Sequence, residues 1–204
     1  MPRIRAATIE EHKRQTRAEI LDAAAVLFRE PGYSEVGLGD LAAAVGIGRT
    51  TLYGYFADKE DVLVNLVESR LPAAVQGLVS GVPDRVSVRE RLGELIVRGL
   101  EFVSSDDDLG ATLHKELPRL SEAAQQRLRR AHGALEDEVV RLCRAGIASG
   151  EFRAFDPIDA GRLVFATIMA ASQTLLRDPD AKQKMHEAAD TLVRFVFEGL
   201  AIGD

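Results

Sequence analysis

The chain has 204 residues, of which 46% are hydrophobic and 28% charged, and it contains no Trp. This composition suits one large or two modest globular domains and excludes a disordered or membrane-embedded chain. The net charge of -6 argues at first against nucleic acid, but the first seventeen residues hold five basic side chains against two acidic ones. The N-terminal segment can therefore carry a positive potential although the chain as a whole is acidic.

The single cysteine, Cys143, excludes an intramolecular disulfide and suits a reducing compartment. The longest apolar run, residues 163–171, is much shorter than the roughly 18 residues of a membrane-spanning helix. The N-terminus has no apolar run long enough for a signal peptide. We therefore expect a cytoplasmic protein without a membrane partner.

The chain begins with ten residues that we expect to form a loose arm carrying Arg3 and Arg5. Such an arm is either a solvated tail or a segment that follows the DNA backbone or an adjacent minor groove. A first helix is predicted from about residue 11 to residue 30, ended by the breaker pair Pro31-Gly32. Its inward residues are Ile20, Ala24, Leu27 and Phe28, and its outer basic residues are Lys13, Arg14 and Arg17.

Residues 34–60 predict two short helices around a tight turn, followed by the start of a third helix. Leu38, Leu41, Ala42 and Val45 recur at helical spacing, and Gly46 directly after them can close the helix in the left-handed conformation. Residues 48–56 predict a second short helix, with Leu52 and Phe56 on one face and donor groups on the other. Asp58 is placed to cap the next helix, and Tyr33 to pack against the three-helix core. This is the helix-turn-helix layout.

The runs RAEILDAAAVLF and GYSEVGLGDLAAAVGIGRTTLYGYFADKED resemble the tetracycline-repressor (TetR) family of bacterial regulators. The most specific features are AAAVGIG, TLY, the pair Tyr55-Phe56, and Lys59 beyond it. The similarity covers about the first third of the chain, and the remainder agrees only in its length and helical character. The resemblance implies a dimeric, DNA-binding repressor that a small ligand releases from a palindromic operator.

The chain departs from that family pattern at three glycines. The family usually has Thr at the position of Gly37, often Arg or Lys at that of Gly39, and Ser at that of Gly48. Glycine as a cap loses only a few tenths of a kcal/mol against Ser. Loss of side chains at Gly37 and Gly39 removes contacts to DNA from the second helix, so we expect readout to depend on the recognition helix and the arm.

The recognition helix carries side chains suited to base edges and phosphates. Arg49 can bond O6 and N7 of guanine, and Thr50 and Thr51 can contact a thymine methyl or a phosphate. The alternative for Tyr53 and Tyr55 is that they are half-buried packing residues. The predicted DNA-binding residues are Gly48, Arg49, Thr50, Thr51, Tyr53, Gly54, Tyr55 and Lys59.

The rest of the chain predicts only helices, about nine in total, which makes the fold class all-α. A kink or break is expected near Leu71, because Pro72 falls inside the fourth helix. The RLRRAH segment in the seventh helix is expected to be a solvated face. The fourth helix is expected to start at residue 59, and the fifth to cover residues 88–104 after a capping box of Ser87 and Glu90. A short sixth helix is expected through Leu109, Leu113 and Leu117. The last three helices are expected over residues 121–149, 157–177 and 180–200.

We divide the chain into a helix-turn-helix DNA-binding domain, residues 1–58, and a helical ligand-binding and dimerisation domain, residues 59–204. The last two helices are apolar enough to form a four-helix interface in a homodimer. Helices five to eight could enclose an apolar pocket for a small-molecule effector. The candidate pocket residues are Phe102, His114, Cys143, Phe165 and Met169, with ordinary core packing as the alternative.

No catalytic motif, phosphate loop or metal-ligand spacing stands out, so we expect neither an enzyme nor a cofactor or metal site. The expected function is that of a sequence-specific transcriptional regulator, a repressor released by an effector. A dimeric activator or a corepressor-dependent form would use the same parts with opposite coupling. The alternative from another class is a helical small-molecule-binding protein whose head binds DNA weakly or not at all.

Overall fold

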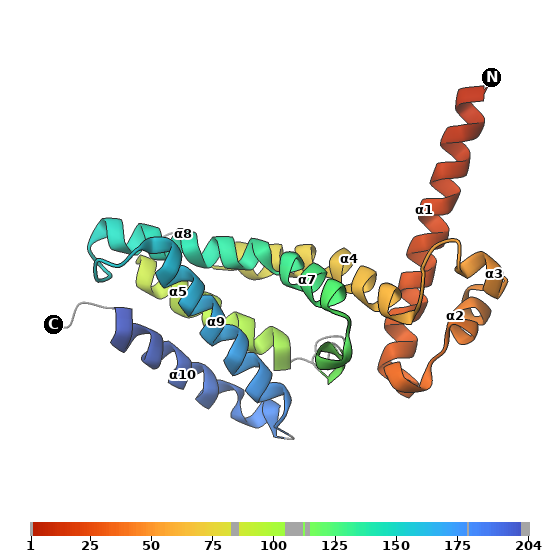
Figure 1. The fold of residues 1–204 in the computed structure, drawn as a ribbon. Coiled ribbons are helices and arrows are strands. Elements are labelled where there is room, and N and C mark those ends of the chain that lie inside the picture. Colours follow the sequence, from red (N-terminus) through yellow and green to blue (C-terminus); the bar gives the residue numbers. More distant parts are fainter. Residues whose placement is uncertain (1, 83–85, 105–111, 113–114, 179, 201–204) are drawn as a thin grey trace.

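The computed structural model describes residues 2–82, 86–104, 112, 115–178 and 180–200, with side chains from Thr8 onward. Throughout these ranges the regular secondary structure is helical, which confirms the predicted all-α class (Figure 1). Helices α1 to α3 form a head at one end of the molecule, and α5 and α7 to α10 form the body. Helix α4 runs from the head into the body.

The head contains the first three α-helices and an irregular connection. Helix α1 covers Pro2–Leu27, α2 covers Leu38–Val45 and α3 covers Arg49–Leu52. Between α1 and α2 lie the short turns η1 (Phe28–Gly32) and η2 (Tyr33–Glu35). Helix α4 covers Lys59–Ser80 and connects the head to the body. The body contains α5 (Val88–Ser104), η3 (Leu117–Arg119), α7 (Glu122–Ala131), α8 (Gly133–Ser149), α9 (Pro157–Leu176) and α10 (Ala181–Leu200).

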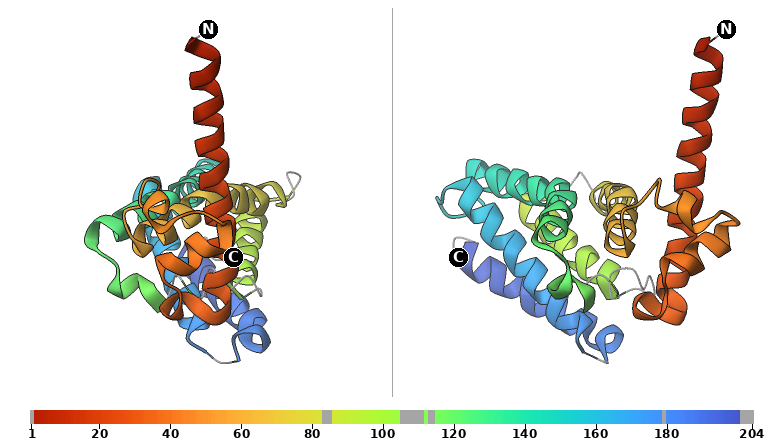
Figure 2. Two further views of the ribbon diagram at one scale, coloured as in Figure 1. Left: turned by 90° about the vertical axis from the view of Figure 1, so that its right-hand side faces the viewer. Right: turned by 45° about the vertical axis from the view of Figure 1, so that its right-hand side comes forward.

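The predicted loose arm is wrong, because α1 begins at Pro2 and its first half projects away from the rest of the chain (Figure 2). Proline is tolerated in the first turn of a helix, where its missing N–H has no intrahelical partner. No breaker follows before Pro31, and the pairs Glu10–Lys13 and Glu11–Arg14 lie at the helical spacing of three residues. Local helical preference therefore extends through the segment that carries Arg3 and Arg5.

Two further boundaries differ from the sequence prediction. Helix α4 is continuous through Pro72 to Ser80, so of the kink or break predicted near Leu71 the break does not occur. Buried Val67 before the proline and buried Val75 after it anchor both halves of the helix. The predicted helix over residues 121–149 is instead two helices, α7 and α8, with His132 at the junction. The short helix predicted around Leu109 and Leu113 falls largely outside the described residues.

Predicted helix ends are confirmed where local side chains cap them. Ser87 and Glu90 form a capping box, with Ser87 N–H donating to Glu90 Oε2 at 2.9 Å and Glu90 N–H donating to Ser87 Oγ at 3.1 Å. Ser121 accepts a hydrogen bond from the Ala124 N–H, and Asp156 accepts from two N–H groups of α9. Each cap satisfies donors that a helix start leaves unpaired.

The apolar side chains gather in two clusters. The head cluster joins residues of α1 to α3 with five residues of α4, which are Val62, Leu63, Val64, Leu66 and Val67. It also includes Leu120, which precedes α7, and Ala124 and Leu128 of α7. The body cluster is formed by α5, α8, α9 and α10, together with Val75 of α4. Helix α4 thus contributes its first half to one core and its second half to the other.

Helices α8 and α9 approach each other closely at one glycine. A methyl group at Gly161 of α9 would lie 2.6 Å from Val140 Cα of α8. Real carbon atoms do not approach so closely, so only glycine permits this contact between the two backbones.

Among the described residues, α4 is the one helix with the length and hydropathy of a membrane span. The core helix of a globular protein meets the same criterion. Val62, Leu63, Val64, Leu66 and Val67 are all 3% exposed or less, because they pack into the head cluster. Burial in the head cluster therefore accounts for the apolar residues in the first half of this helix.

Candidate nucleic-acid interface

The turn between α2 and α3 is fixed by a glycine in the left-handed conformation. Gly46 has φ 75° and ψ 27°, and its N–H donates to the carbonyl groups of Ala42 and Ala43. The next residue, Ile47, also donates to Ala42 O at 3.0 Å. This arrangement confirms the predicted helix end and satisfies the last carbonyls of α2. It fixes the direction in which the chain enters α3.

The start of α2 keeps a cap although Gly37 has no side chain to contribute. The Asp40 carboxylate accepts a hydrogen bond from the Gly37 N–H at 2.8 Å. A carboxylate in the first turn also interacts favourably with the positive end of the helix dipole. The glycines at 37 and 39 are exposed, and a methyl group at Gly39 would have no neighbour within 4 Å among the described residues.

The recognition helix α3 is shorter than predicted, with Leu52 as its last residue and a turn over residues 53–55. Leu52 and Phe56 are 0% and 1% exposed, as the sequence predicted for this face. Hydrogen bonds from Tyr55 N–H and Phe56 N–H to Leu52 O, at 2.9 and 3.1 Å, continue the chain past the helix end. Two buried anchors thus hold a segment that is too short to be stable alone.

The opposite face of α3 presents the predicted donors to solvent. Arg49, Thr50, Thr51 and Tyr53 are exposed, as are Gly48 and Gly54 at the ends of the helix. Arg49 Nη2 lies 3.3 Å from the Tyr53 hydroxyl, and the guanidinium lies 5.9 Å from the centre of the Tyr53 ring. These two side chains therefore form one surface group. Gly54 comes directly after Tyr53 in the chain. A methyl group at Gly54 would lie 3.1 Å from Thr51 O, which is a tight contact.

Tyr55 and Lys59 differ from the exposed donors because the head holds both of them. Tyr55 is half-buried and packs against the head cluster. Lys59 Nζ donates to the Tyr33 carbonyl at 2.8 Å and lies 4.3 Å from the centre of the Tyr33 ring. Tyr33 itself packs edge-on against Phe28, which confirms its predicted place in the core. Burial, with the nearby Glu116, Glu60 and Asp58 carboxylates, raises the pKa of Tyr33 to about 12.

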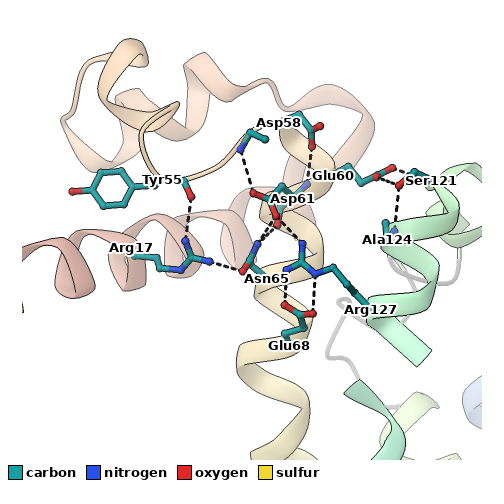
Figure 3. A network of polar contacts seen from close by, with 11 residues as sticks. Arg17, Tyr55, Asp58, Glu60, Asp61, Asn65, Glu68, Ser121, Ala124 and Arg127 are labelled. Carbon is teal, nitrogen blue, oxygen red and sulfur yellow. Dashed lines mark hydrogen bonds and ion pairs between the residues drawn. The ribbon is translucent and has the colours of Figure 1, made fainter. Parts of the chain in front are cut away.

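Sequence reasoning missed the role of Arg17, which was expected only as an outer basic residue. Its Nη1 donates to Tyr55 O at 3.1 Å and its Nη2 to Asn65 Oδ1 at 2.5 Å. The guanidinium also lies 4.6 Å from the centre of the Phe56 ring. Figure 3 shows Arg17 between the recognition turn and α4, with the Tyr55 ring pointing away from the contact. Its partners are 38 and 48 residues away, so no local pattern reveals them.

Two family models match the chain. The model described as bacterial regulatory proteins of the tetR family matches residues 20–66, and that of the tetracyclin repressor-like C-terminal domain matches residues 85–200. The second match alone covers more than half of the chain. The chain belongs to the TetR family.

The fatty acid metabolism regulator protein of Bacillus subtilis is 22% identical over 191 residues, covering 93% of this chain and 98% of the relative. A structure of FadR from Bacillus subtilis in complex with stearoyl-CoA superimposes with a TM-score of 0.69 at 21% identity, covering 86% and 97% of the two chains. RolR in complex with resorcinol superimposes with a TM-score of 0.70 at 22% identity, covering 91% and 89%. These structures share the fold of this TetR-family regulator, which binds DNA.

The predicted pocket residues occupy different environments in the body. Cys143 is fully buried on α8, and burial raises the pKa of its thiol to about 11. Phe165 and Met169 are half-buried on α9, and Phe165 packs against the body cluster. Phe102 lies on α5 with 36% of its surface exposed, and His114 lies outside the described residues.

A separate open hollow lies on the surface of α10. It is lined by Glu187, Asp190, Thr191 and Arg194, and none of the five predicted pocket residues takes part in it. We do not assign the effector to this hollow because its lining residues all come from the exposed side of one helix. A site of that kind encloses little of a ligand's surface.

Proposed function

We propose that this TetR-family protein is a homodimeric repressor that binds a palindromic operator through α3 and is released by a small-molecule effector bound in its body. The observation that carries the proposal is the set of exposed donors on α3, anchored from behind by buried Leu52 and Phe56. A rigid helix with its donors outward can enter a major groove without reorganising the head. We further propose that it acts inside the cell.

The donors have distinct proposed roles. Arg49 reads guanine, for which its forked geometry is suited, and Thr50 and Thr51 contact a thymine methyl or phosphate. Tyr53 donates its hydroxyl to a phosphate, Gly54 lets the DNA backbone come close to the chain, and Gly48 presents the N–H groups at the helix start. We assign Tyr55 and Lys59 to phosphate contacts at the edge of the interface. The contact between Lys59 and Tyr33 supports this, because it limits the positions that the ammonium group can take.

The proposed dimer uses α9 and α10, which lie side by side in Figure 1. Leu163 of α9 is 68% exposed and Phe195 of α10 is 65% exposed. A two-fold axis beside these helices would bury both side chains in a four-helix interface. It would also set two recognition helices at a fixed separation, as successive half-sites of a palindrome require.

The effector site is proposed to lie among α5, α8 and α9, near Phe102, Cys143, Phe165 and Met169. We infer an acyl-CoA thioester as the first candidate class, because a similar structure is a complex with stearoyl-CoA. The apolar body cluster supports this choice, since a long acyl chain needs such surroundings. For the domains, we propose residues 1–58 for DNA and residues 59–204 for the effector and dimerisation.

The test begins with selection of bound duplexes from a random pool by the wild-type protein. Titration of the selected duplex at several salt concentrations should give saturable binding that weakens steeply with salt. Arg49→Ala should lose about 1–3 kcal/mol of binding free energy, as expected for a bidentate base contact. The exposed Arg130 of α7 provides a matched control, because Arg130→Ala removes the same charge far from α3.

The effector is tested on the same duplex. Stearoyl-CoA should release the wild-type protein, and resorcinol serves as a ligand of different chemistry. No selected sequence, or equal binding by Arg49→Ala, would refute the proposed recognition helix. Release by resorcinol alone would refute only the acyl-CoA class.

A further inference from the structure

A chain of polar contacts connects the recognition turn to the body through one arginine (Figure 3). Arg127 of α7 holds Glu68 of α4 through two parallel bonds, Nε to Oε1 at 3.0 Å and Nη2 to Oε2 at 2.6 Å. Its third nitrogen, Nη1, donates to Asp61 Oδ1 at 2.9 Å. The segment RLRRAH was expected to be a solvated face, and this is wrong for Arg127. Its side chain is 36% exposed because it lies across the first half of α4.

The contacts continue from Asp61 into the head. Asn65 Nδ2 donates to Asp61 Oδ1 at 2.7 Å, and Arg17 donates to Asn65 Oδ1. The other end of Arg17 donates to Tyr55 O, directly after the recognition helix. Asp61 Oδ2 also accepts the Ala57 N–H at 3.2 Å, just before α4 begins. We call the series Arg127, Asp61, Asn65, Arg17 and Tyr55 O the relay.

A second polar tie joins the same two helices near the start of α7. Ser121 N–H donates to Glu60 Oε2 at 2.9 Å, and Ser121 Oγ donates to Glu60 Oε1 at 2.5 Å. Together with Arg127, this contact holds α7 at two points along α4. A shift of α7 along α4 therefore has to break charged hydrogen bonds or carry α4 with it.

The relay is not needed to attach α7 to the head. Ala124 and Leu128, which flank Arg127 on the helix, are 4% and 2% exposed within the head cluster. Their burial already attaches α7 to the head through apolar contact. Arg127 additionally fixes the orientation of α7 and its position along α4. A bidentate pair has one geometry, whereas apolar contact allows one helix to slide along the other.

We propose that Arg127 is a positioning residue that couples the body to the recognition helix. Through Asp61, Asn65 and Arg17 it fixes the recognition turn relative to α7, which joins α8 of the body at His132. Movement of α8 on effector binding then changes the position of α3, and operator binding orders α7 in return. The inference rests on the proposed function, because it names the residue through which the two sites of that function interact.

The test uses hydrogen exchange of residues 122–131, measured with and without the duplex that the wild-type protein selects. DNA contacts the head, so slower exchange in α7 reports coupling and not a contact. We expect DNA to slow exchange there at least about fivefold in the wild type, the lower end of the usual range for coupled sites. Arg127→Ala should reduce this slowing to the part that the apolar contacts of Ala124 and Leu128 with the head can carry, and Arg130→Ala, one turn along the same helix, should keep it in full.

A second variant covers the case in which Arg127→Ala does not fold. Arg127→Lys keeps the charge but cannot donate two parallel hydrogen bonds to Glu68, so it should reduce the slowing and leave the protein folded. Equal slowing in the wild type and in both Arg127 variants would overturn the inference while leaving the proposed function in place. Failure of the wild type to select any duplex would overturn the proposed function, and the inference with it.

Discussion

Arg17 of α1 donates a hydrogen bond of 3.1 Å to the carbonyl oxygen of Tyr55, which follows the recognition helix. The same side chain contacts Asn65 of α4 and the ring of Phe56. It therefore joins three segments of the head at one point. A basic residue on α1 that could have contacted phosphate is used instead to support the turn beyond α3.

We predict that Arg17→Ala weakens both the head and its binding to DNA. Loss of the guanidinium leaves Tyr55 O and Asn65 Oδ1 without their donor, which should lower the unfolding free energy by about 1–3 kcal/mol. Denaturant unfolding and duplex titration measure the two effects. Lys13→Ala is the matched control, because Lys13 is exposed and pairs with Glu10 on its own helix, three residues away. An unchanged affinity in Arg17→Ala would show that the turn keeps its position without this support.

Two glycines of the helix-turn-helix should respond in opposite ways to alanine. Gly46 has a positive φ, so Gly46→Ala should destabilise the head by about 1 kcal/mol. Gly39 lies within α2 with open space around it, so Gly39→Ala should stabilise the head by about 0.5–1 kcal/mol. The shift of the thermal unfolding midpoint measures both. Shifts of the same sign would contradict the backbone assignment at one of the two positions.

The Asp61 carboxylate should make the free energy of unfolding fall when the pH is lowered. Partial burial raises its pKa, but hydrogen bonds from Arg127, Ala57 N–H and Asn65 outweigh this and hold the pKa below its usual value. A lowered folded-state pKa stabilises the protein above the unfolded value of about 3.9, and this contribution is lost as pH falls through the folded value. Asp61→Asn should thus lower stability at neutral pH and flatten its decline below about pH 5.

Denaturant midpoints measured from pH 7 down to pH 3 test this expectation. Asp22→Asn is the comparison, because the Asp22 carboxylate is 74% exposed in its pair with Arg70 and such pairs contribute little. A decline as steep in Asp61→Asn as in the wild type would assign the acid sensitivity to other groups.

Charge on the exposed apolar face of α9 and α10 should dissociate the proposed dimer. Leu163→Glu and Phe195→Glu would each place a carboxylate where the two copies meet, and its desolvation would oppose association. Sedimentation velocity should show monomers for both variants and dimers for the wild type. Val26→Glu is the control, because Val26 is 64% exposed on α1 in the head. Dimers that persist in both variants would place the interface elsewhere.

Much of the fold follows from local sequence signals. Helix starts at Asp58, Ser121 and Asp156 are set by a side chain and an N–H two or three residues away, and all three were predicted. The left-handed end at Gly46 is equally local. Such features depend on contacts that a short window of sequence contains.

The features that were missed depend on partners far along the chain. The partners of Arg127 are 59 and 66 residues away, so its segment looked like an ordinary charged surface. Pro72 suggested a break, but two apolar cores on either side of it keep α4 continuous. The donors of α3 could be predicted because they lie within a few residues of one another.

The close contact of Gly161 with Val140 limits how the body can deform. Two backbones in such close contact leave no space for a ligand between them at this level, so we expect α8 and α9 to stay together as a pair. Space for an effector must then come from displacing α5 or α10 from that pair. Because α7 joins α8 at His132, such a rearrangement would be transmitted through α7 to the head, with little of the movement absorbed by the helices between.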